Sequence, residues 1–308
     1  MKRYQVNIII LNYEGRQLLP QYLPSIVEAA ETSAHQCVVT VLDNCSTDGS
    51  VEYVKQHFPT VKVVRAKENK VLCSYNEVVR DLDDDIVILL NNDIGVDKNF
   101  VDPLITVFDQ YPDAFFVSTR GDRSKAIFRM GTLIASLDGF PKDQFGHSFN
   151  TGMGAFDRKK FVELGGYDEL YLPGRYEDLD LCYRGWKRGW KGYYEPQSIP
   201  HHEGETSFKK RFSEKEIERM VFRNSIFFMA KNISDPILIV QFWVLLVPRL
   251  FRFLLMGKSH MWAGFFEAFS RFPEVLWHKR QVREQLLLKD KEAIQLINSE
   301  IEYSYAQK

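Results

Sequence analysis

Compact apolar runs alternate with helical patterns through the first hundred residues, and this alternation limits the possible folds more than any other feature. The apolar runs cover residues 6–11, 38–42, 61–65 and 86–90. Each is continuous, which is typical of strands covered on both faces of a sheet. Helical patterns lie between them, at residues 18–30, 51–57 and 75–82. The repeat predicts right-handed crossovers and a Rossmann-like α/β unit with a mostly parallel sheet.

Polar residues follow three of these strands directly. The clusters are Asn12-Tyr13, Asp43-Asn44 and Asn91-Asn92-Asp93. In open parallel sheets, ligands bind beyond the carboxyl ends of the strands, so these clusters mark the expected site. No G-x-G-x-x-G follows the first strand and no G-x-x-x-x-G-K-[ST] occurs in the chain. This disfavours simple NAD-binding and P-loop sites.

Composition narrows the functional class. The 308 residues are 45% hydrophobic with a formal net charge of -1, which argues against a nucleic-acid partner. The four cysteines form no C-x-x-C pair, so neither a zinc knuckle nor a disulfide framework is indicated, and a cytoplasmic setting is expected. No signal-peptide pattern is recognisable at the N-terminus.

The charge is distributed unevenly along the chain. Residues 1–206 hold 23 basic against 30 acidic residues, and residues 207–308 hold 17 against 11. We therefore expect a first domain at residues 1–212, with one half at 1–110 and a second at 111–212. A basic, aromatic and helical region would follow at 213–308.

The basic region contains an uncharged apolar stretch of 13 residues, 236–248, shorter than the roughly 20 residues that a membrane-spanning helix needs. Aromatic and basic residues occur together there and favour amphipathic helices in a membrane interface with anionic lipids. The alternatives are a packed helical cap and a dimer interface, which also use aromatic residues.

Two acidic groups are candidates for chemistry. Asp93, just after a strand, is suited to hold Mg²⁺ or Mn²⁺ through hard oxygen ligands, although Asn and Asp are also common in turns. Glu177, Asp178 and Asp180 begin a predicted helix, where they complement the helix dipole or supply a general base. Three acids so close together would tend to raise one pKa. Beside a carboxylate site, His201 or His202 becomes a candidate metal ligand.

The order of the motifs resembles the family 2 glycosyltransferases, which have the GT-A fold and use nucleotide sugars. The resemblance covers about residues 4–232 and is closest to the rhamnosyltransferase-like branch. It is carried by these segments: 6–13 (VNIIILNY), 42–50 (LDNCSTDGS), 90–93 (LNND), 150–156 (NTGMGAF), 165–169 (GGYDE), 176–184 (YEDLDLCYR) and 201–204 (HHEG).

The resemblance implies that residues 1–212 are a catalytic domain, with a nucleotide-binding half at 1–110 and an acceptor and catalytic half at 111–212. It also implies a role for individual residues. Asn12, Tyr13, Asp43 and Asn92 would bind the nucleotide of a UDP-, TDP- or GDP-linked sugar. Gly154, Ala155 and Glu177 would line the donor and acceptor pocket. Asp93 and His201, with His202 as the alternative, would hold the divalent cation, and Asp178 would be the catalytic base.

The implied function is that of a metal-dependent inverting glycosyltransferase in bacterial surface-polysaccharide biosynthesis. It would act on a glycan or lipid-linked acceptor, in the cytoplasm or on the inner face of the cell membrane. Two alternatives are a nucleotidyltransferase, which should carry a glycine-rich basic loop after the first strand, and a non-catalytic binding protein, which would be expected to lose Asp93 or Asp178. The chain has no such loop, since residues 11–16 hold one glycine and one arginine, and it retains both Asp93 and Asp178.

The chain departs from the family pattern at several positions. Val71 stands where the family often has glycine, and Tyr75 replaces a small residue, so the donor pocket is expected to be narrower. Asn91 replaces the first acid of the family's DxD motif. No Q-x-x-R-W follows His202, and Arg223-Asn224 lies in the matching helix. This favours the addition of one sugar per encounter.

Overall fold

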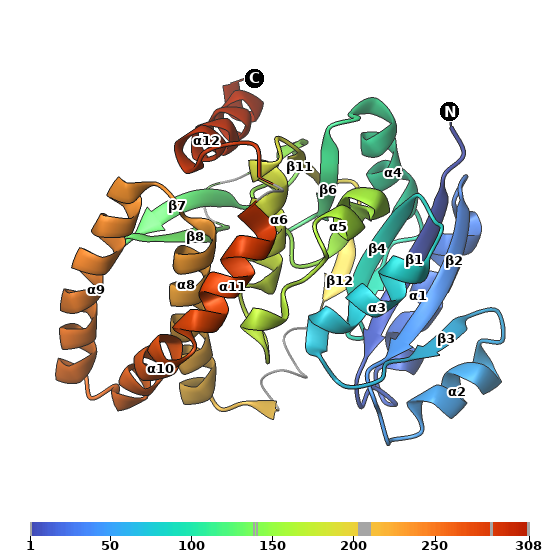
Figure 1. The fold of residues 1–308 in the computed structure, drawn as a ribbon. Helices are drawn as coiled ribbons and strands as arrows, with labels where there is room; N and C mark the ends of the chain where they lie inside the picture. The colour runs from blue at the N-terminus through green and yellow to red at the C-terminus, as the bar shows by residue number, and fades with distance from the viewer. Residues whose placement is uncertain (1, 138, 140, 203–210, 284–285, 307–308) are drawn as a thin grey trace.

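The computed structural model describes residues 2–137, 139, 141–202, 211–283 and 286–306. Its centre is an eight-stranded sheet in the order β3-β2-β1-β4-β10-β6-β11-β9 (Figure 1). The strands are β1 (Gln5–Asn12), β2 (Gln36–Asp43), β3 (Lys62–Arg65), β4 (Ile86–Asn91), β6 (Ala114–Thr119), β9 (Gly146–His147), β10 (Gly154–Asp157) and β11 (Lys191–Glu195).

Most of this sheet is parallel, as predicted. β1 pairs in parallel with β2 and β4, β2 with β3, and β6 with β11. β10 is antiparallel to both β4 and β6, and β9 is antiparallel to β11. Six of the strands therefore run in one direction, and their carboxyl ends lie at the same edge.

Helices cover both faces of the sheet. Along β1, Val6, Ile8 and Ile10 belong to one buried cluster, whereas Ile9 and Leu11 belong to the other. This is why the apolar runs are continuous. The helices over the sheet are α1 (Leu19–Thr32), α2 (Ser50–His57), α3 (Tyr75–Asp81), α4 (Val101–Gln110), α5 (Arg158–Glu163) and α6 (Glu177–Lys187), with short 3₁₀ helices η1 (Val71–Ser74) and η2 (Glu169–Tyr171).

Five further helices follow: α8 (Glu214–Asn232), α9 (Pro236–Leu255), α10 (Ser259–Ser270), α11 (Phe272–Arg283) and α12 (Asp290–Ala306). The helical region predicted after residue 213 is thus present, with α9 at its outer edge (Figure 1). One hydrophobic cluster joins sheet residues such as Phe116 to Phe228, Leu246 and Ile297. The core therefore crosses the boundary near residue 212.

Two small strand pairs complete the fold. β7 (Lys125–Arg129) and β8 (Thr132–Ser136) form a hairpin, whose turn residues Met130 and Gly131 have φ of +49° and +76°. Two left-handed residues are typical of a tight hairpin turn. β5 (Ile94–Val96) pairs antiparallel with β12 (Pro200–His202). β12 begins only at Pro200, because a turn follows β11.

Helix α9 is longer than the uncharged stretch suggested. It continues through Pro248 and reaches 20 residues. In the described part of the chain, it is the one helix that is long and apolar enough to cross a membrane by length and composition. The core helix of a water-soluble protein can pass the same test.

Candidate active site

The three polar clusters meet at the carboxyl edge of the sheet. The strand registers place Asn12 opposite Asp43 and Leu11 opposite Asn91. The Nδ2 of Asn12 donates a hydrogen bond to Oδ1 of Asp43 at 3.1 Å, and the Nδ2 of Asn92 donates to Oδ1 of Asn12 at 3.0 Å. All three side chains are buried. The fold thus brings together Asn12 of β1, Asp43 of β2 and Asn92, which follows β4, as their positions at strand ends predicted.

The residues that surround this cluster fix its geometry. Ser46 donates its backbone N–H to Oδ2 of Asp43 at 3.1 Å, and its hydroxyl accepts from Asn12 at 3.2 Å. The Nε of Arg65 lies 3.6 Å from Oδ2 of Asp43. At Gly15, a Cβ would lie 2.1 Å from Oδ1 of Asn12, so only glycine fits beside the cluster. The sequence analysis assigned no role to Ser46, Arg65 or Gly15.

Tyr13 and Val71 border the same edge. Tyr13 is 36% exposed, and the guanidinium of Arg211 lies 5.7 Å from its ring centroid. Val71 has φ of +51°, a left-handed conformation that is strained for a β-branched residue. The conformation explains why glycine suits this position. Tyr75 lies in the core, fully buried, and its hydroxyl donates to the carbonyl of Leu90 at 2.7 Å.

Asp178 lies at the same edge of the sheet. β10 is antiparallel to β4, with Gly154 opposite Leu89, so residues 151–153 lie at the carboxyl end of β4. A Cβ on Gly152 would be 3.8 Å from Oδ2 of Asp178, which accepts a hydrogen bond from Nδ2 of Asn150 at 3.2 Å. The first turn of α6 therefore carries Asp178 to the edge where β4 ends at Asn91.

Two more carboxyl groups accompany Asp178. Burial, and after it the charge of Asp178, raises the pKa of Glu177 to about 8. Asp122 follows β6 and accepts hydrogen bonds from the Thr151 hydroxyl at 2.6 Å and the Gly152 N–H at 3.0 Å. Burial raises its pKa to about 7. Burial also raises the pKa of Asp178, against which the hydrogen bond from Asn150 acts.

The sequence analysis missed Asp122. A signal was present, because Arg120-Gly121-Asp122 follows β6 in the same way that the recognised clusters follow β1, β2 and β4.

Asp180 has a structural role, unlike its neighbour Asp178. It is fully buried and accepts hydrogen bonds from Lys231 at 2.7 Å and from the Arg184 Nε at 2.7 Å. Although burial acts to raise it, these two cations hold the pKa of Asp180 below its usual value. Of the acidic residues at the start of α6, Asp178 therefore lies at the edge of the sheet, and Asp180 anchors α6 to α8.

The loop that leads into α6 has a strained backbone. Arg175 and Tyr176 have φ of +76° and +79°, and such conformations persist only where the surroundings impose them. Asn224 on α8 supplies this restraint, since its Nδ2 donates to the carbonyls of Tyr171, Gly174 and Arg175 at 2.7 to 2.9 Å. Arg223 donates to the carbonyl of Leu172 at 2.6 Å. The Arg223-Asn224 pair thus positions the segment before Asp178.

The predicted metal ligands flank the β5–β12 pair. Asp93 precedes β5 and is 6% exposed. His201 pairs with Gly95 across the ladder, and its Nε2 lies 2.6 Å from Oδ1 of Asp97, at the other end of β5 from Asp93. The imidazole of His201 is 61% exposed. The side chain of His202 lies outside the described residues.

Of these predicted ligands, Asp93 fits Mg²⁺ or Mn²⁺ held partly by a substrate, whereas His201 is paired with Asp97 and is not brought to Asp93. No group of three or more His, Cys, Asp or Glu suited to a metal occurs among the residues that the structure describes. Mg²⁺ is commonly held by one or two carboxylates together with substrate phosphates, so a buried Asp93 at the carboxyl edge of the sheet meets that requirement.

Gly154 and Ala155 lie in the central sheet. β10 places them between β4 and β6, and Ala155 is fully buried. The Ala155 side chain packs in the hydrophobic cluster on one face of the sheet, so the structure gives it no exposed surface toward a donor or acceptor. The residue of this motif beside Asp178 is Gly152.

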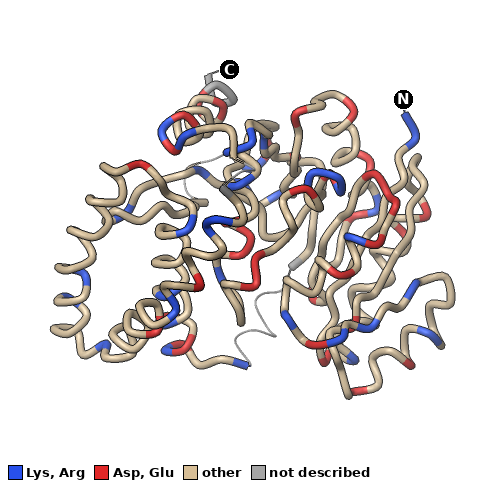
Figure 2. Tube along the Cα trace, viewed as in Figure 1, with Lys and Arg blue, Asp and Glu red and all other residues tan. Residues whose placement is uncertain are grey.

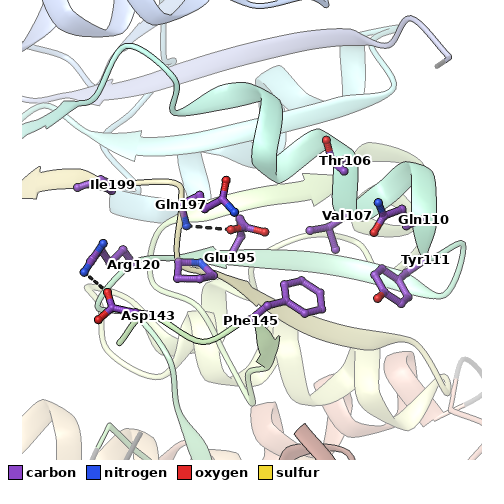
Figure 3. A pocket seen from close by; sticks show the side chains of 11 residues that line it. Thr106, Val107, Gln110, Tyr111, Arg120, Asp143, Phe145, Glu195, Gln197 and Ile199 are labelled. Carbon is purple, nitrogen blue, oxygen red and sulfur yellow. Dashed lines mark hydrogen bonds and ion pairs between the residues drawn. The ribbon is translucent and has the colours of Figure 1, made fainter. Parts of the chain in front are cut away.

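A cavity of about 640 Å³ lies elsewhere, beside α4 and β11 (Figure 3). Its described lining includes Tyr111, Phe145 and Glu195, and the Arg120–Asp143 ion pair closes one side. None of the predicted site residues is among the described residues that line it. The candidate active site is therefore the edge formed by β1, β2, β4 and α6.

Comparison with known proteins agrees with this geometry. The model of the family "Glycosyl transferase family 2" matches residues 7–164, which include all three strand-end clusters. No curated protein matches the sequence. Similar solved structures share the fold at low sequence identity.

One such structure is S. aureus TarS 1–349 in complex with UDP-GlcNAc, at a TM-score of 0.58 and 14% identity, covering 98% of this chain and 92% of that one. Another is GalNAc-T7 with UDP, GalNAc and Mn²⁺, at a TM-score of 0.59 and 15% identity. It covers 76% of this chain, which spans about half of GalNAc-T7 (49%). With the family model matching half of the sequence, the chain belongs to glycosyltransferase family 2 and has the GT-A fold.

Proposed function

We propose that the chain transfers a sugar from a nucleotide-sugar donor to a hydroxyl of a glycan or lipid-linked acceptor, with inversion, in bacterial surface-polysaccharide biosynthesis. The observation that carries this proposal is the position of Asp178, beside Gly152 at the carboxyl end of β4. The family membership and the nucleotides named for the similar structures support it.

The strand-end cluster would bind the nucleotide. Asp43 and Asn12 present hydrogen-bonding groups to the base and ribose, and Tyr13 offers an exposed aromatic face for stacking. Asn92 belongs to this cluster and directly precedes Asp93. We assign Asp93 to a divalent cation that would neutralise charge on the leaving diphosphate. Of the two candidate second ligands, we favour His202, whose backbone pairs with Ile94 next to Asp93, over His201, which pairs with Gly95.

Asp178 would act as the general base. The acceptor oxygen forms a bond to the anomeric carbon, the bond from that carbon to the diphosphate oxygen breaks, and the acceptor proton passes to Asp178. One displacement from the opposite face inverts the configuration. The raised pKa of Asp178 suits proton removal.

We also propose that α9 rests on the cytoplasmic face of a membrane with anionic lipids. One side of α9 is strongly exposed and apolar, including Val240, Val244, Val247, Phe251 and Leu255 at 60 to 73% exposure. Residues 236–266 contain Arg249, Arg252 and Lys258 but no Asp or Glu, as the coloured trace of α9 shows (Figure 2). Apolar surface with basic residues and no acids complements an anionic bilayer.

An interfacial position fits α9 better than a membrane crossing. Phe242, Leu246 and Leu250 are buried in the main core, and Arg249 donates to the hydroxyl of Thr132 at 2.6 Å. A crossing helix would lose these contacts.

Flotation with liposomes tests this position. The wild type should float with anionic vesicles, and Val247→Glu with Phe251→Glu should not. Flotation that is equal in the two proteins, or a dimer that conceals the face, would overturn the membrane contact.

Donor binding is tested by thermal shift with UDP-, TDP- and GDP-sugars, each with Mg²⁺, Mn²⁺ or EDTA. A donor at 100 times its dissociation constant stabilises the fold by about 2.7 kcal/mol. We expect one nucleotide to stand out only with metal, and Asp93→Ala to lose that shift. No shift with any donor would refute nucleotide-sugar use.

A further inference from the structure

A second cavity lies beside the segment that precedes Asp178. Its volume is about 400 Å³, within the range of small-ligand sites. The β7–β8 hairpin, α8, α9 and the start of α10 enclose it. None of the active-site residues to which a role is assigned above is among the described residues that line this cavity.

The charged residues that line this cavity are mostly basic. Arg129, Arg249, Arg252 and Lys258 line it, with Glu218 as the acidic residue in the described lining. Glu218 is already occupied, because Lys258 and His260 both pair with it. Within the described ranges, the three arginines form no ion pair with a carboxylate. The cavity therefore carries uncompensated positive charge.

Arg249 is fixed in position. Its Nη1 donates to the Thr132 hydroxyl at 2.6 Å, and its guanidinium lies 5.3 Å from the Phe222 ring centroid. The hairpin tip packs directly on α9, since a Cβ at Gly131 would lie 3.0 Å from the Cα of Phe242. A half-buried guanidinium held by neutral groups keeps further N–H donors for an anion. Planar guanidinium groups suit phosphate oxygens well.

Tyr176 joins this cavity to the active site. It lines the cavity and directly precedes Glu177 and Asp178. Burial raises the pKa of its hydroxyl, which the Arg249 charge lowers and the Asp178 charge raises. The charges of Arg249 and Asp178 therefore both act on Tyr176. Residues of α8 and α9 line the cavity together with Tyr176.

We propose that this cavity binds a phosphate or diphosphate group of the acceptor, through Arg249, Arg252 and Arg129. The inference rests on the proposed function, and it names the class of acceptor as a phosphorylated molecule. The exposed apolar side of α9, whose Arg249 and Arg252 reach the cavity, favours an acceptor whose phosphate carries a lipid chain.

Calorimetric titration with farnesyl diphosphate, a soluble lipid diphosphate, tests the proposal on the full chain in EDTA. Arg249→Gln and the exposed Arg252→Gln should each weaken binding at least tenfold, since each removes charged hydrogen bonds to phosphate. Lys215→Gln, on an exposed part of α8, and Asp93→Ala, at the nucleotide edge, should bind as the wild type does.

Inorganic pyrophosphate and farnesol distinguish the sources of the phosphate. Weaker binding of pyrophosphate than of farnesyl diphosphate supports a lipid-linked acceptor, and equal binding supports a water-soluble phosphorylated one. Binding of farnesol as tight as that of farnesyl diphosphate would overturn the phosphate site, as would unchanged affinity in Arg252→Gln. The donor thermal shift is read in the same variants, so a failure here with donor binding intact leaves the proposed function standing.

Discussion

Asp178 and Asp180 have different roles because their surroundings in the fold differ. They lie two positions apart on α6, yet burial raises the pKa of Asp178, whereas Lys231 and Arg184 hold that of Asp180 low against the effect of burial. The sequence predicted that one acid in this group would be perturbed, but not which one. The partners of Asp180 lie on another helix and one turn further along α6, so their pairing emerges only in the folded chain.

At the residue scale, Asn150→Ala should shift the pH dependence of activity. The Asn150 amide stabilises the ionised form of Asp178. Its removal raises the pKa of Asp178, so the acidic limb of kcat/KM should move to higher pH, with a greater loss at pH 6 than at pH 8. The measurement is a pH–rate profile. A loss of equal size at every pH would show that Asn150 does not act on this ionisation.

Val71 supplies a second test at this scale. A left-handed non-glycine residue costs about 1–3 kcal/mol, and the added chain entropy of glycine offsets about 0.5–1 kcal/mol of the gain. Val71→Gly should therefore raise the free energy of unfolding by about 1 kcal/mol in urea denaturation, with Val71→Ala gaining less. Destabilisation by Val71→Gly would contradict the assignment of strain.

At the element scale, α8 holds the loop and helix that carry Asp178, the proposed general base. Asn224 bonds three carbonyls of residues 171–175, and Lys231 pairs with Asp180 and Asp168. The strands and helices themselves were predictable, because burial on two faces leaves a continuous apolar pattern. The placement of β10 between β4 and β6 was not predictable, because it depends on pairing between distant segments.

Asp180→Ala tests the anchor between α6 and α8. The substitution leaves Lys231 and Arg184 buried without this partner, and losing one member of a buried ion pair costs about 3–5 kcal/mol. Because the pKa of Asp180 is lowered in the fold, its contribution is present above the pKa of an unfolded aspartate and is lost as pH falls. Urea denaturation at pH 7 and at lower pH should show the difference shrinking in acid. A constant difference would exclude this linkage.

At the scale of the whole molecule, the edge of the sheet gathers groups that are far apart in the sequence. Asn12, Asp43 and Asn92 were predictable, since each follows a recognisable strand. Asp122 follows β6 in the same way but was missed, and its contact with Gly152 was not predictable, because that contact depends on β6 and β10 becoming neighbours. The helical region then adds a basic cavity beside Tyr176 and an exposed apolar helix face. The proposed sites for the donor, the general base and the acceptor phosphate are therefore formed by different elements of the fold.

The central claim is that Asp178 removes the acceptor proton, and water can replace the acceptor in the most direct test. Donor hydrolysis is measured for the wild type and Asp178→Asn, using the nucleotide sugar and metal that give the largest thermal shift. General base catalysis contributes about 10²–10⁴-fold, so Asp178→Asn should lose at least a hundredfold in rate and keep the donor-induced shift. Hydrolysis within a few-fold of the wild type in Asp178→Asn would contradict the account.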